Sequence, residues 1–406
     1  MYVVSRSTRV LVLNNYPLDE VWEEVRRGEK PDHHLFGINH FGALGYEVRI
    51  VPFAQSQALQ WLERMLTRVR FPIPLGALDR QWSGWRLLRE ADLIYAPCGN
   101  ETTLLSYLRS IGLLSTPIVS LQHHALNRGR MASLREPWIR RQIRGTDALP
   151  ALSRQVADEV NARNGSSSKK SCVLPWGPDA TFYPSTDTAG EGVVAAGRTG
   201  RDFLAFGRAA SEAQCPAEII CMEYDVRPEF GEFAANVKIT TPKSGGVFTY
   251  PEMMQQLLTA RVLAIPLFDD PGSLAGLTSL LDAIGLGKPV IMTRHPLIDV
   301  DIEALGIGRW VEPNDVVGWR DAIRWFDAHP AESREMGRHA RALVDDGNFH
   351  SGEFASRMVA LFDAVLNRKP SEFVSHDAAS FASRSSGLST FAAGPETTVT
   401  SKWTKP

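Results

Sequence analysis

Short apolar segments recur along the whole chain and alternate with stretches that have the periodicity of helices. Several segments are apolar at nearly every position, which is typical of strands buried on both faces of a sheet. Strands that alternate with helices predict parallel sheets with right-handed crossovers, an α/β fold. The predicted strands are residues 10–14, 48–52, 93–96, 118–121, 148–152, 193–196, 218–222, 237–240, 262–266, 289–293 and 309–311.

The pattern divides the chain into two α/β halves. Residues 184–191 (PSTDTAGE) can bury little apolar surface, so we expect the linker near 184–192. A chain of 406 residues also exceeds the size at which one core stops growing, about 250–300 residues. We predict domains at 1–183 and 184–350. A C-terminal helix at 351–370 should pack back toward the first domain, and residues 371–406, rich in Ser, Thr, Ala and Gly, should form a disordered tail.

Composition excludes several classes of protein. The net charge of −2 gives no reason to expect a nucleic-acid partner. The four cysteines are scattered, without metal-site spacing, which favours buried thiols in a reducing compartment. Arginines interrupt the first apolar residues where a signal peptide would need an apolar run, and no window is long enough to span a membrane. These features predict a cytoplasmic protein.

The first candidate site is the loop GRTGRD at 197–202, directly after the predicted strand 193–196. Gly197 and Gly200 let the backbone approach a ligand closely. Arg198 and Arg201 can face one anion, because guanidinium groups bind phosphate oxygens in pairs. The helix predicted at 203–213 would add the partial positive charge of its N-terminus. The alternative is a surface turn with solvated arginines. The pattern supports the phosphate-binding loop and the surface turn about equally.

The second candidate site is the start of a helix near residue 276, before the predicted strand 289–293. Gly276, Thr278 and Ser279 offer amides and hydroxyls at a helix start, where phosphate binds well. Asp282 follows one turn later, and its carboxylate can accept hydrogen bonds from both hydroxyls of a ribose. An ordinary helix–turn–strand unit with a solvated Asp282 is the alternative, and motif spacing slightly favours it.

Two histidine pairs follow predicted strands. His123 and His124 end the strand 118–121, and His33 and His34 precede a helix predicted at 35–44. Residues at such strand ends face the ligand crevice of α/β folds. Adjacent side chains point in different directions, so neither pair is expected to chelate a metal. A structural histidine is the more common outcome for each.

Two amphipathic segments could meet a membrane or an anionic acceptor. The alternative is a packed apolar side with a solvated basic face. One segment spans residues 128–144 and carries Arg128, Arg130, Arg135, Arg140, Arg141 and Arg144. The other spans residues 61–74 and carries Trp61, Leu62, Met65, Leu66 and Val69.

Together these motifs resemble the retaining, family 4 type of glycosyltransferase, which has two facing Rossmann-like domains with a donor cleft between them, the GT-B fold. The resemblance covers residues 9–367 and rests on VLPWGPDATFYP at 173–184, the Gly-Arg loop at 197–202 and GLTSLLDAIGLGKPVIMT at 276–293. It implies that the C-terminal domain binds a nucleoside-diphosphate sugar and that the N-terminal domain holds the acceptor. One departure is Leu274, which stands where the family commonly has a glutamate.

The resemblance implies transfer of a hexose-type sugar, from a donor linked to UDP, to an acceptor hydroxyl with retention of configuration. The reaction that the resemblance implies needs neither a metal ion nor a cofactor. The acceptor is a saccharide, a lipid-linked saccharide or a small molecule, and peripheral contact with the inner membrane face fits the amphipathic segments. The implied catalytic residues are His123 and Arg198. The implied donor ligands are Gly197, Arg198, Arg201, Gly276, Thr278, Ser279 and Asp282, with His34 and His124 as further donor or acceptor contacts.

Two other functions remain open on the sequence. A nucleotide-sugar epimerase shares the facing-domain architecture and would act on the donor without an acceptor. A catalytically weak nucleotide-sugar-binding relative would be consistent with Leu274 and with Asp282, where the family usually has glutamate. An NAD-dependent dehydrogenase is disfavoured, because no strand–helix turn carries the G-x-G-x-x-G fingerprint.

Overall fold

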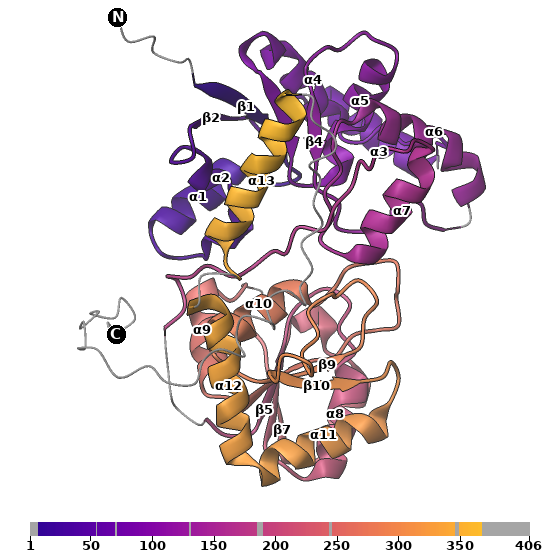
Figure 1. The fold of residues 1–406 in the computed structure, drawn as a ribbon. Helices are drawn as coiled ribbons and strands as arrows, with labels where there is room; N and C mark the ends of the chain where they lie inside the picture. The colour runs from indigo at the N-terminus through magenta and orange to yellow at the C-terminus, as the bar shows by residue number, and fades with distance from the viewer. Residues whose placement is uncertain are drawn as a thin grey trace, which may run out of the picture.

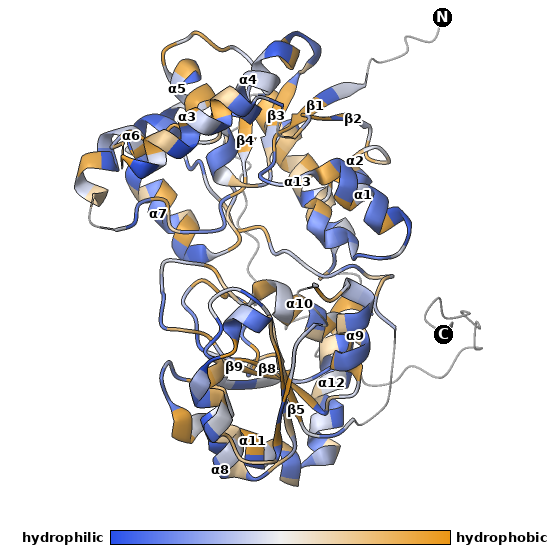
Figure 2. Cartoon of the chain, turned by 180° about the vertical axis from the view of Figure 1, so that it is seen from behind, coloured by the Kyte–Doolittle hydropathy of each residue, from blue (hydrophilic) through white to orange (hydrophobic). Residues whose placement is uncertain are grey.

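The computed structural model describes residues 7–53, 55–69, 71–129, 131–184, 190–242, 246–345 and 349–367. These residues form two α/β lobes, each with a parallel sheet and helices on both of its faces (Figure 1). The predicted tail at 371–406 and Arg130 lie outside the described residues. In both lobes the strands are mostly hydrophobic, whereas the helices carry polar residues on their outer sides (Figure 2). The two-domain α/β architecture expected from the sequence is therefore confirmed.

The N-terminal sheet has four parallel strands in the order β2-β1-β3-β4. They are β1 (Thr8–Val12), β2 (Tyr46–Ile50), β3 (Leu93–Ala96) and β4 (Ile118–Ser120). The strand predicted at 148–152 is wrong as a strand: Ala148 and Ala151 form isolated parallel bridges beside β4. Pro150 lies between them and has no N–H to donate, so a continuous ladder cannot form.

Helices surround this sheet: α1 (Leu18–Arg26), α2 (Ile38–Phe41), α3 (Gln57–Arg68), α4 (Leu78–Leu87), α5 (Thr103–Ser110), α6 (Ala132–Gly145) and α7 (Arg154–Asn164). The helix predicted at 35–44 is wrong in extent. A 3₁₀ turn, η1 (Asp32–Leu35), precedes α2, and Phe36 and Gly37 between them have φ angles of 49° and 81°. Left-handed residues of this kind interrupt a right-handed helix.

The C-terminal sheet has six parallel strands in the order β10-β9-β8-β5-β6-β7. They are β5 (Val193–Ala196), β6 (Ala217–Ile220), β7 (Val237–Thr240), β8 (Val262–Ile265), β9 (Val290–Thr293) and β10 (Gly308–Val311), all close to the predicted positions. The accompanying helices are α8 (Phe203–Ala213), α9 (Tyr250–Leu258), α10 (Leu277–Gly285), α11 (Val316–Ala328) and α12 (Pro330–Asp345).

The strand order reverses beside β5. The chain proceeds from β5 outward to β6 and β7, then returns to β8 on the other side of β5. Loops that leave the carboxyl ends of neighbouring strands at such a reversal form the ligand crevice of open α/β sheets. Here they are the loop 197–202 after β5 and the loop after β8 that leads into α10. The Phe268 N–H donates to the Gly200 carbonyl at 3.0 Å, so the two loops lie side by side.

The last described helix, α13 (Ser351–Leu366), leaves the C-terminal lobe and lies against the N-terminal lobe beside α2 (Figure 1). Its Phe362 ring is fully buried and contacts the rings of Phe41, Tyr46 and Tyr95 at centroid distances of 5.2, 5.7 and 5.3 Å. The Tyr46 hydroxyl donates to the Asp363 carboxylate at 2.5 Å. The helix is thus part of the core of the first lobe and ties the two lobes together.

Replacing Phe362 with alanine removes a buried aromatic ring from this junction. We expect the F362A variant to lose about 3–5 kcal/mol of folding free energy, because a cavity remains where the ring was. Urea unfolding followed by circular dichroism measures the loss. A V317A control, at an exposed position on α11, should unfold like the unmodified protein. An F362A midpoint equal to that of the control would show that the junction contributes little to stability.

Candidate functional site

Arg201 holds the loop after β5 in place. The side chain is 9% exposed, and its guanidinium donates to the Ala196 carbonyl at 3.1 Å and to the Thr199 carbonyl at 2.7 Å. A third bond, 2.7 Å long, goes from Nη2 to the Ser279 hydroxyl on α10. Burial lowers the pKa of this guanidinium to about 10, so it stays charged at neutral pH. Arg201 therefore joins the two loops that the sequence indicated separately.

Gly197 makes the loop possible. Its φ is 136°, and a Cβ at this position would lie 2.5 Å from the Arg201 guanidinium. A side chain here would displace the buried arginine. Arg198 follows and is exposed, in contrast to Arg201. The two arginines, equivalent in the sequence pattern, thus differ: one is packed inside the loop and one faces solvent beside it.

The start of α10 presents the backbone amides expected from the sequence. Gly276 is the N-cap with a φ of 81°, and a Cβ there would lie 2.8 Å from the Met292 Cε atom. Leu277, Thr278 and Ser279 form the first turn of α10, whose N–H groups have no partners within the helix. Such a helix start carries a partial positive charge. Arg201 bonds this turn, so loop 197–202 lies next to it.

Asp282 lies one turn into α10 and is 7% exposed. One of its oxygens, Oδ1, accepts hydrogen bonds from two tyrosine hydroxyls: Tyr183 at 2.6 Å and Tyr250. Burial raises the pKa of this carboxyl to about 6, although both tyrosines and the charge of Arg201 favour the ionised form. Neither tyrosine was expected at the site from the sequence. Tyr183 lies near the end of residues 173–184, the segment between the two lobes, which we call the interdomain segment. Tyr250 is the first residue of α9, and neither position forms a recognisable motif with Asp282.

His34 extends this cluster into the N-terminal lobe. Its Nε2 atom lies 3.4 Å from the Tyr250 hydroxyl. Because the single Tyr250 proton goes to Asp282, Nε2 is the donor in this contact. The neighbouring His33 is fully buried among Trp176 and Tyr183, and burial lowers its pKa to about 3. His33 is therefore a neutral core residue, whereas His34 reaches the group around Asp282.

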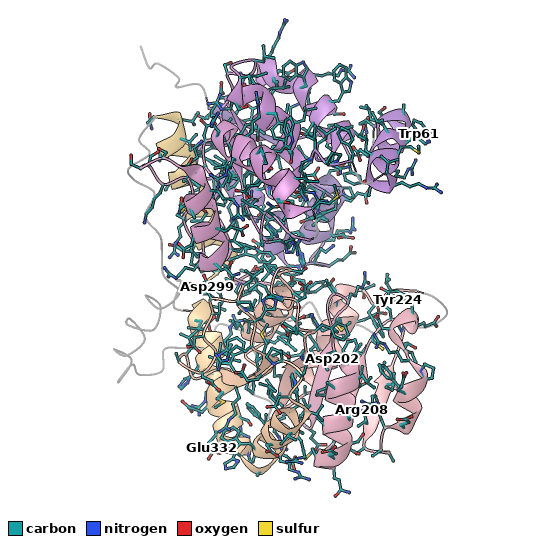
Figure 3. All side chains as sticks on the ribbon, turned by 90° about the vertical axis from the view of Figure 1, so that its right-hand side faces the viewer. Trp61, Asp202, Arg208, Tyr224, Asp299 and Glu332 are labelled. Carbon is teal, nitrogen blue, oxygen red and sulfur yellow. The ribbon has the colours of Figure 1, made fainter. Side chains whose placement is uncertain are left out.

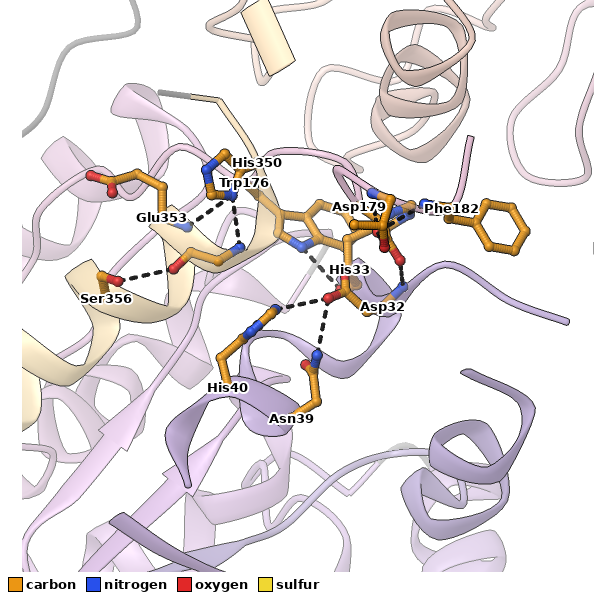
Figure 4. A network of polar contacts seen from close by, with 12 residues as sticks. Asp32, His33, Asn39, His40, Trp176, Asp179, Phe182, His350, Glu353 and Ser356 are labelled. Atoms are coloured by element: carbon orange, nitrogen blue, oxygen red, sulfur yellow. Dashed lines mark hydrogen bonds and ion pairs between the residues drawn. The ribbon is translucent and has the colours of Figure 1, made fainter. Parts of the chain in front are cut away.

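A polar network holds the turn that carries these histidines (Figure 4). Asp179, in the interdomain segment, accepts a bond from the Asp32 N–H at 2.8 Å through Oδ2. Its Oδ1 accepts from the N–H groups of Thr181 and Phe182, at 2.7 and 3.1 Å. The Asp32 carboxylate in turn accepts from His40 at 2.8 Å. The interdomain segment and the turn 31–37 are thus fixed to each other.

His123 and His124 lie after β4, and each makes a different contact. His123 Nε2 lies 2.6 Å from the Pro97 carbonyl, so Nε2 carries the proton and Nδ1 keeps the lone pair. Burial lowers the pKa of His123 to about 4, which keeps it neutral. His124 accepts the Leu274 N–H at 2.9 Å through Nδ1. That contact joins the N-terminal lobe to the loop before α10.

Both histidines line a cavity of about 1120 Å³ in the N-terminal lobe. Apolar and polar side chains both line the cavity. The apolar ones include Leu66, Phe71, Ile73, Leu75 and Ile139, and the polar ones include Asn15, Arg80, Glu101, Gln122, Arg128 and Arg135. Arg80 and Glu101 form a nearly buried ion pair with an Nε–Oε2 distance of 2.5 Å. The cavity therefore suits a ligand with both apolar and hydroxyl-rich parts.

Comparison with solved structures shows the fold of the chain. HepE from Anabaena in complex with UDP has 13% sequence identity and a TM-score of 0.61, covering 88% of this chain and 100% of that one. A sucrose-phosphate synthase from Thermosynechococcus elongatus has 16% identity and a TM-score of 0.58, covering 90% and 100%. A glycosyltransferase from Rickettsia africae has 13% identity and a TM-score of 0.59, covering 89% and 99%. No protein-family model and no curated protein sequence matches the chain.

These similarities, together with the two facing parallel sheets, define the fold as GT-B. Within the part of the chain that the structure describes, no helix is both long and apolar enough to cross a bilayer. Over the same residues, no group of three His, Cys, Asp or Glu side chains is arranged to hold a metal ion.

The raised pKa of Asp282 predicts how the folding stability of the protein depends on pH. Its folded-state value of about 6 lies above its ordinary value of 3.8, so ionisation destabilises the folded state. The loss of folding free energy on ionisation of Asp282 is absent at low pH. It grows as the pH rises from about 4 to about 6 and amounts to about 3 kcal/mol above that range. We expect D282N to be more stable than the unmodified protein at pH 8 by about 1–3 kcal/mol, with a smaller difference at pH 4.5.

Urea unfolding at the two pH values measures this difference. The exposed Asp321, replaced by asparagine, serves as the control and should change little at either pH. A D282N variant that is equally or less stable at pH 8 would contradict the proposed cost of the buried carboxylate.

Proposed function

We propose that this protein is a glycosyltransferase that moves a hexose from a UDP-linked donor to an acceptor hydroxyl with retention of configuration. The observation that carries the proposal is the junction of loop 197–202 with the start of α10, through the bond from Arg201 to Ser279. Solved structures of the same fold support the donor class, since Anabaena HepE was crystallised with UDP, with UDP and glucose, and with UDP-glucose.

In this proposal the donor diphosphate lies between the exposed Arg198 and the first turn of α10. The amides of that turn and the Thr278 hydroxyl donate to phosphate oxygens, and Arg198 neutralises their charge. Gly197 and Gly276 allow the backbone to approach closely. Arg201 acts from inside the loop, where it holds the Ser279 hydroxyl and contributes its positive charge.

We assign the ribose to Asp282. Both tyrosines bond Oδ1, which leaves Oδ2 to accept hydrogen bonds from the ribose diol. The tyrosines orient the carboxylate without neutralising it. With a pKa of about 6, Asp282 is mostly ionised at pH 7.5, where it is a strong acceptor.

For the chemical step, the residues must stabilise a departing diphosphate and an oxocarbenium-like sugar. Arg198 and the amides at the start of α10 serve the diphosphate. Neutral His123 offers its Nδ1 lone pair as an acceptor for a sugar hydroxyl, because its Nε2–H is bound to Pro97. His34 and His124, at the boundary between the lobes, are further contacts for donor or acceptor. The acceptor enters the cavity of the N-terminal lobe, which His123 lines.

Substitution of Arg198 tests the donor site. We expect UDP to raise the melting temperature of the unmodified protein and to bind R198A about tenfold to a hundredfold more weakly, because a charge-assisted hydrogen bond contributes about 1.5–3 kcal/mol. Arg208, exposed on the outer face of α8, supplies a matched R208A control that should bind normally (Figure 3). A panel of UDP-, GDP- and dTDP-sugars identifies the base. Equal UDP binding by R198A and R208A would refute the assignment of the loop.

Product analysis separates the proposed reaction from its alternatives. Incubation with the best-binding sugar nucleotide and a set of sugar acceptors should yield a glycoside whose anomeric proton has the configuration of the donor. An epimerase would convert the donor without an acceptor, and NMR would detect the epimer. Binding without any turnover would favour the nucleotide-sugar-binding relative, consistent with Leu274 at the usual glutamate position.

A further inference from the structure

Helix α3 has an apolar face that the rest of the described chain leaves partly exposed. None of its residues is buried. Three exposed apolar side chains lie on one side of the helix, and a fourth, at the C-cap, continues that side. They are Trp61, Leu62, Met65 and Val69, with exposed fractions of 59%, 39%, 38% and 63%. An apolar stripe of this kind on a surface helix marks an interaction surface.

The neighbouring helix α4 also exposes aromatic and basic side chains. Trp82, Trp85 and Arg86 are exposed on α4, and Arg89 is exposed in the 3₁₀ turn η2 (Leu88–Glu90) that follows it. Trp82 is 56% exposed although tryptophan is usually well buried. We call the outer side of α3 and α4, with these residues, the α3–α4 face.

Apart from Glu90, whose carboxylate pairs with Arg49, the exposed charges of the α3–α4 face are positive. Arg64, Arg68, Arg86 and Arg89 are exposed, and within the described residues no carboxylate pairs with any of them. The two acidic residues of the same helices point inward. Glu63 accepts the Asp79 N–H at 2.9 Å, and the fully buried Asp79 accepts the N–H groups of Gln55 and Ser56 at 3.0 and 2.7 Å.

Helix α6, in the amphipathic segment 128–144, differs from α3 because two of its arginines have partners and its apolar side is packed. Arg140 pairs with Glu136 at 2.9 Å, and Arg141 donates to the Ser110 hydroxyl at 3.1 Å. Ile139 and Ile143 are buried, so the apolar side of α6 already packs against the lobe. The cationic apolar surface is therefore at α3 and α4, and α6 is a packed helix.

We propose that the α3–α4 face docks the protein on an anionic phospholipid bilayer. Exposed tryptophans beside arginines fit the membrane interface, where indole rings reside and cations meet lipid phosphates. A second copy of the chain fits poorly, because a symmetric contact would bring the same four arginines together. Trp61 lies at the outer edge of the N-terminal lobe, away from the other lobe (Figure 3). Docking there leaves the boundary between the lobes open.

The same helix also lines the cavity assigned to the acceptor. Glu63, Leu66 and Thr67 of α3 contribute to the cavity, whereas Trp61 and Met65 belong to the outer face. If the proposed glycosyltransferase function holds, the acceptor is amphiphilic and reaches the cavity from the membrane. The docking itself does not depend on that function.

Vesicle flotation tests the docking. The full chain is mixed with vesicles of phosphatidylglycerol and phosphatidylcholine at 3:7, or of phosphatidylcholine alone. We expect the protein to float with the first and not with the second, and to be released at high salt. The W61S/M65S and R64E/R68E variants should each bind at least about tenfold more weakly, since an arginine near the surface contributes about fivefold. V317S, at an exposed apolar site on α11, should bind normally.

Three results would overturn the proposal. They are no flotation with anionic vesicles, equal flotation of the α3 variants and V317S, or a dimer in size-exclusion chromatography that W61S/M65S abolishes. Melting temperatures of the same variants show that they are folded. UDP binding is read separately from flotation, so failure of the donor assignment and failure of the docking are distinguishable.

Discussion

The buried carboxylate of Asp282 is the constraint on which the arrangement of the site depends. A nearly buried carboxylate needs hydrogen-bond donors, and here they come from separate parts of the chain: Tyr183 from the interdomain segment and Tyr250 from α9. Tyr250 also contacts His34 of the other lobe. Satisfying one acidic group thus brings together the interdomain segment, a helix of the C-terminal lobe and a turn of the N-terminal lobe.

The same carboxylate weakens the fold that it organises. Burial raises its pKa to about 6, so ionisation of the buried carboxyl costs free energy. Functional sites commonly keep such strained groups, because the group is useful to a ligand and the surrounding structure can tolerate it. Elsewhere the chain compensates: α13 adds Phe362 to the N-terminal core, and one apolar cluster runs from that core through Trp176 and Tyr183 to α10.

The two lobes carry different kinds of surface. In the C-terminal lobe the candidate ligand-binding groups lie at the carboxyl ends of β5 and β8. There the loop 197–202 and the start of α10 provide backbone N–H groups as hydrogen-bond donors. In the N-terminal lobe a large cavity lies under α3, whose other side is apolar and uncovered. We infer a division of roles, with a rigid donor site in one lobe and an acceptor site open to a membrane in the other. Loops and surface helices vary more readily than strand ends, which is consistent with this division.

The hydrophobic pattern was enough to predict most strands, the parallel sheets and the loops that follow them, because burial on both faces leaves a continuous apolar run such as Val262–Ile265. The strand predicted at 148–152 was wrong although Pro150, visible in the sequence, already argued against a continuous ladder there. The sequence pattern treated Arg198 and Arg201 alike, and only tertiary packing buried one and exposed the other. It could not find Tyr183 and Tyr250, because their bond to Asp282 joins residues 99 and 32 positions apart. Local pattern records which faces are buried, whereas contacts between distant segments are decided when the two lobes pack together.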